Sequence, residues 1–281
     1  AQHGSLAGAA RALSVNHSTV LRRINAFEQS HGVRLFERQR TGYKLTGEGR
    51  QLLEAAQDVE TVVNSLERKI AGKDLRLAGA IRLTTTDSFL FELLSPHLAA
   101  FHKAYPDIIL NVTVTNHVLS LSRRDADVAI RPGRAIPAPL VGARISDINF
   151  ALYASPAYWR DHSHLDIKTL SWLGVGDVLA DAPPGQWLRT NIADEQITYT
   201  ADTFMALRHA AEEGSGITIL PCFLGDASDR LVRASDVLEA CRNGLWILTH
   251  KDLMQTTRIK TFTEFMIAAL KTETSRLLGV H

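Results

Sequence analysis

The stretch SLAGAARALSVNHSTVLRRINAFEQSHGVRLFERQRTGYKLTGEG, residues 5–49, decides the fold of the first part of the chain. Leu6 and Ala10 recur at helical spacing and predict a first helix, for which the preceding serine is a suitable N-cap. Val20 and Ile24 recur in the same way and predict a second helix after a tight turn. This order is the layout of a helix-turn-helix, whose second helix can lie in the DNA major groove.

The outer face of the predicted second helix carries the candidate DNA-binding residues. Val20, Ile24 and Phe27 form its expected inner face, so the polar side chains between them point outward. Arginine can pair with guanine through two hydrogen bonds, and Ser, Thr and Asn bind base edges or phosphates. We expect the following residues of this helix and of the basic loop behind it to contact DNA: Asn16, His17, Ser18, Thr19, Arg22, Arg23, Arg34, Arg38 and Arg40.

A solvated polar face on an ordinary helical hairpin would have the same pattern, and the charge distribution helps to separate the two interpretations. Residues 1–50 contain eight Lys or Arg and three Asp or Glu, a net charge of +5. The other 231 residues contain 23 basic and 27 acidic residues, a net charge of −4. A basic segment joined to a mildly acidic remainder favours nucleic-acid binding.

The same segment resembles the N-terminal winged helix-turn-helix domain of LysR-type transcriptional regulators. The matching residues are Gly4-Ser5-Leu6, Ala9-Ala10, Leu13, Ile24, Phe27-Glu28, Gly32, Leu35-Phe36, Arg38, Leu45-Thr46 and Gly49. Two positions depart from the family pattern: Leu21 stands where serine is frequent, and Phe27 replaces the usual leucine. Family members open with one further helix, so we expect the first N-terminal helix segment to be missing from this sequence.

Residues 50–72 predict a long linker helix, because no Pro or Gly interrupts them before Gly72. An apolar stripe runs along this segment at spacings of three and four: Leu52, Leu53, Ala56, Val59, Val62, Val63, Leu66 and Ile70. Such a stripe needs a partner, and we expect a second copy of the chain, although packing onto its own domain is the alternative. The resemblance also implies that the linker helix joins the DNA-binding domains of two chains, so we expect a homodimer or homotetramer.

From residue 79 onward the sequence alternates strands and helices, which predicts mostly parallel sheets with helices on both faces. Two successive sets of these elements predict two lobes: lobe I at about 79–153 and 248–281, and lobe II at about 154–247. A helix is expected at 89–105 and a short one at 119–124. This body resembles the LysR-type effector domain, whose fold is that of type 2 periplasmic binding proteins.

The predicted fold class is therefore α+β overall. A winged helix-turn-helix DNA-binding domain occupies 1–49, a linker and dimerisation helix 50–72, and a two-lobed α/β effector-binding domain 79–281.

An effector site is expected between the lobes, where polar turns follow the strands. The candidate residues are Thr86, Asp87, Ser88, Asn116, Arg131, Thr203 and Phe204. Arg131 can pair with an anion, so a small carboxylate is one candidate for the small-molecule effector. The alternative is local: Asp87, Ser88 and Thr203 as helix caps and Arg131 as a surface charge.

Enzyme, metal and membrane classes find no support in the sequence. No GxSxG, P-loop, HExxH or complete GxGxxG occurs. Cys222 and Cys241 lack CxxC or metal-ligand spacing, so we expect no cofactor and no metal. No run approaches the about 18 apolar residues of a membrane span, and no signal peptide opens the sequence as given. A cytoplasmic location is expected.

The leading hypothesis is a sequence-specific, DNA-binding transcriptional regulator, not an enzyme, that a small molecule between the two lobes modulates. Its partners would be double-stranded DNA, the effector, further copies of itself and, for an activator, RNA polymerase. A solute-binding protein and an enzyme on the same two-lobed fold are the alternatives. The basic helix-turn-helix argues against the first, and the lack of a catalytic motif against the second.

Overall fold

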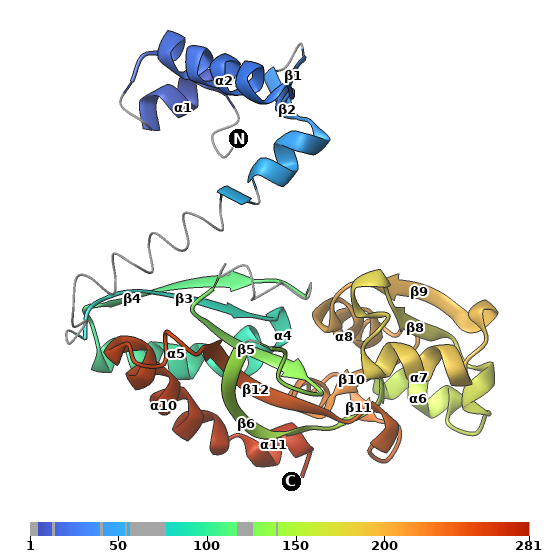
Figure 1. The fold of residues 1–281 in the computed structure, drawn as a ribbon. Helices are drawn as coiled ribbons and strands as arrows, with labels where there is room; N and C mark the ends of the chain where they lie inside the picture. Colours follow the sequence, from blue (N-terminus) through green and yellow to red (C-terminus); the bar gives the residue numbers. More distant parts are fainter. Residues whose placement is uncertain are drawn as a thin grey trace. The chain divides into compact units, whose positions relative to one another are not determined.

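The computed structural model describes residues 5–12, 15–39, 42–53, 55–56, 77–116, 126–138 and 140–280 (Figure 1). The chain divides into two compact units, Ala1–Gly72 and Lys73–His281. Residues 47–53 and 55–56 are helical, but the rest of the predicted linker stripe lies outside the described residues, as does the predicted helix at 119–124. Within the described ranges, no helix combines the length and the apolar character that a membrane span requires.

The first unit begins with helix α1 (Leu6–Ala12) and helix α2 (His17–His31). Ser5 is the N-cap of α1, as predicted: its Oγ accepts a hydrogen bond of 3.0 Å from the backbone N–H of Gly8. Leu6, Ala10 and Val20 are buried where the two helices meet. Because alanine is small, α1 can approach α2 closely, and this contact fixes which face of α2 is left outside.

The prediction that Phe27 belongs to the inner face of α2 is wrong. Val20 is buried and Ile24 is half-buried, whereas Phe27 is 37% exposed and stacks on His31 with 4.3 Å between the ring centroids. Helix α1 has only seven residues, so it covers the first part of the 15-residue α2 and leaves the later turns uncovered in the described structure.

A two-stranded antiparallel hairpin, β1 (Phe36–Gln39) and β2 (Gly42–Leu45), forms the wing. The Glu28 carboxylate ties it to α2, because one oxygen accepts from the N–H groups of Leu35 (2.7 Å) and Phe36 (3.2 Å). Gly49 lies in the first turn of the next helix, so close to the residue before β1 that a Cβ there would be 2.1 Å from the Leu35 carbonyl oxygen. The glycine of the family pattern is thus required by a close approach of two backbones.

The second unit contains two five-stranded sheets. The first has the order β4-β3-β5-β12-β6, in which β3, β4 and β5 are parallel and β12 is antiparallel to both of its neighbours. Its strands are β3 (Gly79–Thr85), β4 (Ile108–Val114), β5 (Val128–Gly133), β6 (Leu140–Ile148) and β12 (Asn243–His250). Helices α5 (Ser95–Ala104) and α10 (Thr257–Lys271) pack against this sheet and against each other.

The second sheet has the order β11-β7-β10-β8-β9, with β8, β9 and β10 parallel and β7 antiparallel to β10. Its strands are β7 (Phe150–Ala154), β8 (Trp172–Val175), β9 (Ile197–Ala201), β10 (Ile217–Pro221) and β11 (Val232–Arg233). Helix α8 (Phe204–Glu212) packs on four of these strands, β7, β8, β9 and β10. Further helices of the unit include α6 (Pro156–His162), α7 (Pro183–Asn191), α9 (Cys222–Gly225) and α11 (Thr274–Leu278).

The two predicted lobes correspond to the two sheets, but the chain crosses between them at other residues than expected. Strand β7 lies in the second sheet, so the first crossing falls at Asn149 and not after residue 153. Strand β12 lies in the first sheet, so the return falls at 242–243 and not at 247–248. Both strands are apolar and buried, and such a run has no sequence feature that tells one lobe's sheet from the other's.

The helix predicted at 89–105 is divided into three parts. A single turn, α4 (Asp87–Phe89), leads into a π-helical turn, η1 (Leu90–Leu94), and then into α5. Wider π turns occur mostly as single insertions and are frequent at functional sites. The apolar spacing alone does not reveal the extra residue in the turn.

Candidate DNA-binding surface and ligand cavity

Six of the nine predicted DNA-binding residues are exposed in the described part of the first unit. Exposed side chains are Asn16, His17, Ser18, Arg22, Arg23 and Arg34. Thr19 is half-buried, Arg38 belongs to β1 without a described side chain, and Arg40 lies outside the described residues. Val20 is buried against α1, whereas Arg22 and Arg23 are both exposed.

The start of α2 is suited to a phosphate. The backbone carbonyl of Asn16 accepts from the N–H groups of Thr19 (2.9 Å) and Val20 (3.2 Å), while its side chain makes no capping hydrogen bond. No acidic residue lies in the first turn, so nothing there neutralises the positive end of the helix dipole. The helix start therefore offers N–H groups, a free amide side chain and positive potential to an anion.

A cavity of about 320 Å³ lies between the two sheets of the second unit. Five of the predicted effector residues line it: Thr86, Ser88, Asn116, Arg131 and Phe204. The remaining lining residues are Phe89, Pro132, Arg134, Ile148, Phe150, Val178, Leu179, Asp181, Ala182, Pro183, Pro184, Pro221, Phe223 and Asn243.

Two predicted effector residues do not line this cavity. Thr203 is the N-cap of α8, where its Oγ1 accepts from the N–H of Ala206 at 3.0 Å. Asp87 opens α4, and its Oδ1 accepts from the N–H of Ser88 at 2.8 Å. Thr203 is thus a helix cap, which is the alternative that the sequence had left open for it. Asp87 is not the cap of α4, whose N-cap is Thr86, although its side chain does accept from the local backbone.

One end of the cavity is polar and positively charged. Arg131 on β5 donates from Nη2 to the Thr115 carbonyl oxygen (2.5 Å) and to Thr84 Oγ1 (3.2 Å), which fixes the guanidinium in place. Desolvation by burial lowers the pKa of Arg131, but a guanidinium keeps its proton at physiological pH. The hydroxyls of Thr86 and Ser88 lie 3.3 Å apart on the same part of the wall.

Much of the remaining lining is apolar and includes four phenylalanines, although Asn116, Arg134, Asp181 and Asn243 also line the cavity; of the phenylalanines, the sequence predicted only Phe204. Phe89 of the first lobe stacks on Phe223 of the second, with 5.0 Å between the ring centroids and 18° between the planes. Phe150 and Phe204 lie 5.9 Å apart. None of these four residues ends a strand: Phe89 ends α4, Phe150 begins β7, Phe204 begins α8 and Phe223 lies in α9, so a position at the end of a strand could not have selected them.

The two cysteines have the properties of core residues. Both are free and fully buried. Burial raises the pKa of the Cys241 thiol to about 12, and burial likewise raises that of Cys222. Both groups are therefore thiols near neutral pH, whereas the thiolate is the reactive form. No cluster of three or more His, Cys, Asp or Glu suited to a metal ion occurs in the described part of the chain.

Comparisons with protein families match both units. The family described as "Bacterial regulatory helix-turn-helix protein, lysR family" matches residues 1–50. The family described as "LysR substrate binding domain" matches residues 76–271, which is more than half of the chain.

Individual relatives are regulators. The chain is 27% identical over 232 residues to the HTH-type transcriptional regulator CrgA of Neisseria meningitidis, covering 80% of this chain and 77% of that protein. It is 24% identical over 287 residues to the glycine cleavage system transcriptional activator of Escherichia coli, covering 97% and 91%. Among solved structures, the full-length virulence activator AphB of Vibrio cholerae matches with a TM-score of 0.63 and 23% identity, covering 95% and 94%. The last likeness concerns the fold alone.

Proposed function

This chain belongs to the LysR family of DNA-binding transcriptional regulators, and from that premise we propose which surface binds DNA and which class of effector it binds. The operator would be bound by the exposed face of α2, with Arg22 and Arg23 as its main cations and Arg34 and the wing arginines on the flanking backbone. Effector binding would take place in the cavity between the lobes. In this proposal residues 1–49 bind DNA, residues 50–72 form the linker and dimerisation helix, and residues 79–281 bind the effector.

The effector is proposed to be an amphipathic carboxylate with a ring or a branched chain. The observation that carries this is that one cavity combines four phenylalanines with the hydrogen-bonded guanidinium of Arg131 and the hydroxyls of Thr86 and Ser88. A volume of about 320 Å³ lies at the lower end of the range for small-molecule sites and exceeds the need of a two-carbon anion. The guanidinium would pair with the carboxylate, while Phe89, Phe204 and their neighbours would enclose the apolar part.

Thermal unfolding of the full-length protein with a set of carboxylates tests this proposal. Benzoate and cyclohexanecarboxylate should raise the melting temperature, whereas acetate should not; a ligand at a hundredfold excess over its Kd stabilises by about 2.7 kcal/mol. Arg131→Gln should remove the effect. Arg144→Gln is the matched control, because Arg144 pairs with Asp147 on β6 and does not line the cavity. Stabilisation by neutral aromatic compounds as strong as by benzoate would refute the charge requirement.

We further propose that the linker stripe joins two copies, so that two heads bind one partly symmetric operator. Val59→Asp with Leu66→Asp should dissociate the dimer and weaken operator binding together, because unpaired charge would enter the seam. Thr61→Asp, on the opposite side of a helix with that spacing, is the control. Wild-type mass in sedimentation with both aspartates present would contradict the stripe's role.

Recruitment of RNA polymerase is proposed only for the case that the protein activates transcription. A cytoplasmic location is proposed because a regulator of this family acts on chromosomal DNA. The absence of enzyme activity is supported by family membership, since the named relatives are transcriptional regulators.

A further inference from the structure

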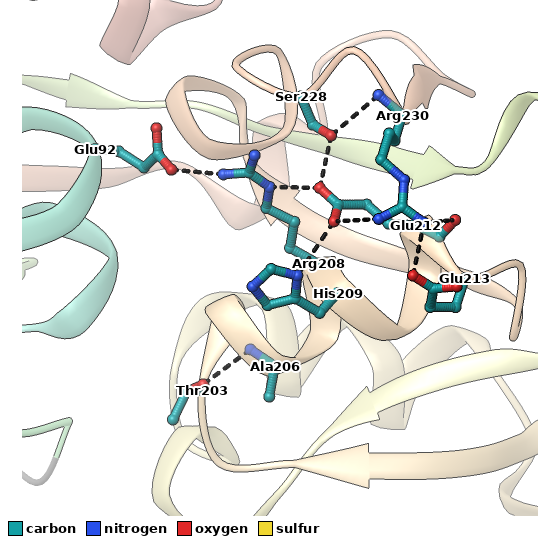
Figure 2. A network of polar contacts seen from close by, with 9 residues as sticks. All are labelled: Glu92, Thr203, Ala206, Arg208, His209, Glu212, Glu213, Ser228 and Arg230. Carbon is teal, nitrogen blue, oxygen red and sulfur yellow. Dashed lines mark hydrogen bonds and ion pairs between the residues drawn. The ribbon is translucent and has the colours of Figure 1, made fainter.

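A chain of ion pairs crosses from one lobe of the second unit to the other (Figure 2). Arg208 lies on α8 of lobe II, and its Nη1 is 2.5 Å from Oε1 of Glu92, which lies in the π turn of lobe I. We propose that the Glu92–Arg208 pair is a latch that holds the two lobes in the arrangement that encloses the cavity.

The latch is anchored firmly on the side of lobe II. Nε of Arg208 donates to Oε1 of Glu212 at 2.8 Å, one turn further along α8, and the same oxygen accepts from Ser228 Oγ at 2.6 Å. The Glu212 side chain is only 5% exposed. Arg208 is thus oriented before it meets Glu92, and an oriented guanidinium loses little freedom when the pair forms.

Glu92 is positioned from the side of lobe I. Nη2 of Arg276 on α11 donates to the Glu92 backbone carbonyl at 3.1 Å, and Arg276 also pairs with Glu273. The π turn itself closes with a hydrogen bond from the N–H of Ser95 to the Leu90 carbonyl. The carboxylate is therefore carried on a held segment and not on a mobile loop.

Water screens this pair less than an ordinary surface ion pair. The side chain of Arg208 is 15% exposed and that of Glu92 is 20% exposed. Removing Arg208 would leave the partly desolvated Glu92 carboxylate without this ion pair, and removing Glu92 would leave Arg208 with Glu212 alone; either loss costs more than the loss of an exposed pair. The pair consequently favours the arrangement in which the lobes meet.

Both ends of the latch are joined to the cavity wall through a single helical turn. Ser88 and Phe89 line the cavity, and Glu92 follows them along the same helical segment. Phe204 lines it from the other lobe, and Arg208 comes one turn later on α8. The contact between α4 and α8, together with the Phe89–Phe223 stack, brings the lobes together beside the latch.

A ligand that pushes Phe89 and Phe204 apart would favour separated lobes and oppose the latch. A ligand that bridges the two side chains would favour the arrangement that the latch stabilises. The importance of the latch for effector response rests on the proposed cavity function. The lobe arrangement itself can be measured without effector or DNA, so failure of the latch and failure of the effector proposal are distinguishable.

Distances between spin labels in the full-length protein test the latch. Lys103→Cys on α5 of lobe I and Thr190→Cys on α7 of lobe II supply exposed attachment sites, while native Cys222 and Cys241 are fully buried. Labelled chains are diluted with unlabelled ones, so that each measured pair lies within one chain. With the Glu92–Arg208 pair intact, the two spin labels should show one main distance. In Glu92→Gln, the share of molecules with a second, longer distance should rise about tenfold, which corresponds to a change of ~1.4 kcal/mol in the equilibrium between the two lobe arrangements.

The variants separate a latch from general loosening. Glu92→Gln leaves the contacts of Glu212 intact, and Arg208→Gln together with Glu92→Gln should open the lobes no further than Glu92→Gln alone. Arg230→Gln is the matched control, because Arg230 pairs with Glu213 and Glu212, both of lobe II. An unchanged distance distribution in Glu92→Gln, or equal opening in Arg230→Gln, would overturn the proposal.

Discussion

The exposed face of α2 and the cavity of the second unit differ in how their residues come together. Seven of the predicted DNA-binding residues lie between 16 and 34, and the structure describes most of them as exposed. The cavity takes its lining from residues as far apart as Thr86 and Asn243. One site is therefore a property of a single helix, whereas the other exists only after two sheets have come together.

This difference separates two kinds of residue. An exposed polar side chain at the start of α2, such as that of Arg22, can be removed with little consequence for folding, because it faces solvent and the DNA that it is proposed to bind. Around the cavity and the latch, polar groups are held by other parts of the protein, as Arg131 is by the Thr115 carbonyl. Substitutions there should change the stability of the fold as well as ligand binding.

The largest expected effect is on operator affinity and comes from the exposed face of α2. Arg22→Ala with Arg23→Ala should lower operator affinity by about 1–3 kcal/mol for each arginine that contacts a base. The free energy of unfolding should stay nearly unchanged, because both side chains are exposed. Gel shifts over a series of salt concentrations and urea unfolding measure the two quantities. Lys103→Ala, an exposed cation on α5, controls for net charge; wild-type affinity in the double variant would remove α2 from the DNA-binding surface.

A smaller effect, on the free energy of unfolding, is expected when Glu212 of the buried network beside the latch is changed. Burial opposes ionisation of this carboxyl, but hydrogen bonds from Ser228 and Arg208 outweigh it and lower its pKa below the ordinary value of 4.5. Its contribution to stability is therefore present above pH 4.5 and is lost as the pH falls through the lowered pKa. Glu212→Gln should destabilise the protein by about 1–3 kcal/mol at pH 7 and should make stability less dependent on pH between 5 and ~3.

Urea unfolding at several pH values measures this effect. Glu213→Gln is the neighbouring control, since the Glu213 side chain is 70% exposed and pairs only with the exposed Arg230 among the contacts described. Equal behaviour of the two glutamine variants would mean that the buried network stabilises no more than a surface pair.

The smallest change should be seen at the thiols. At pH 7.5 the folded protein should react with Ellman's reagent far more slowly than it does in urea, because both cysteines are buried and their pKa values are raised. Counting the thiols that react before and after unfolding tests this. Fast reaction of one thiol in the folded state would contradict this prediction and would reveal an accessible, redox-sensitive cysteine in the second unit.

The sequence was most informative where the physical signal is local. The spacing of Leu6, Ala10 and Val20 is enough to find the two helices, and a serine before the first identifies its cap. The exposure of Phe27 could not be found in this way, because it depends on how far a neighbouring helix reaches.

Long-range features were predicted only in outline. Alternating strands and helices predict two lobes, but the apolar strand β7 fits either sheet, and the pairing of β12 with β5 joins residues more than 100 apart. Polar turns after strands indicate part of the cavity, including Ser88 and Arg131. Phe223 and the aromatic residue stacked on it, Phe89, were not predicted to line the cavity, because aromatic residues at helical spacing are usual in any core.

The place of β12 has a consequence for how the protein is made. This strand lies between β5 and β6 in the interior of the first sheet, although it follows the whole of lobe II along the chain. During synthesis, β7 to β11 leave the ribosome as one continuous segment and can pair at once. The first sheet has to wait with an unfilled position between β5 and β6 until residues 243–250 emerge, and it presents two unpaired strand edges meanwhile. The lobe that begins first is thus completed last, and aggregation during expression should depend on that interval more than on either finished lobe.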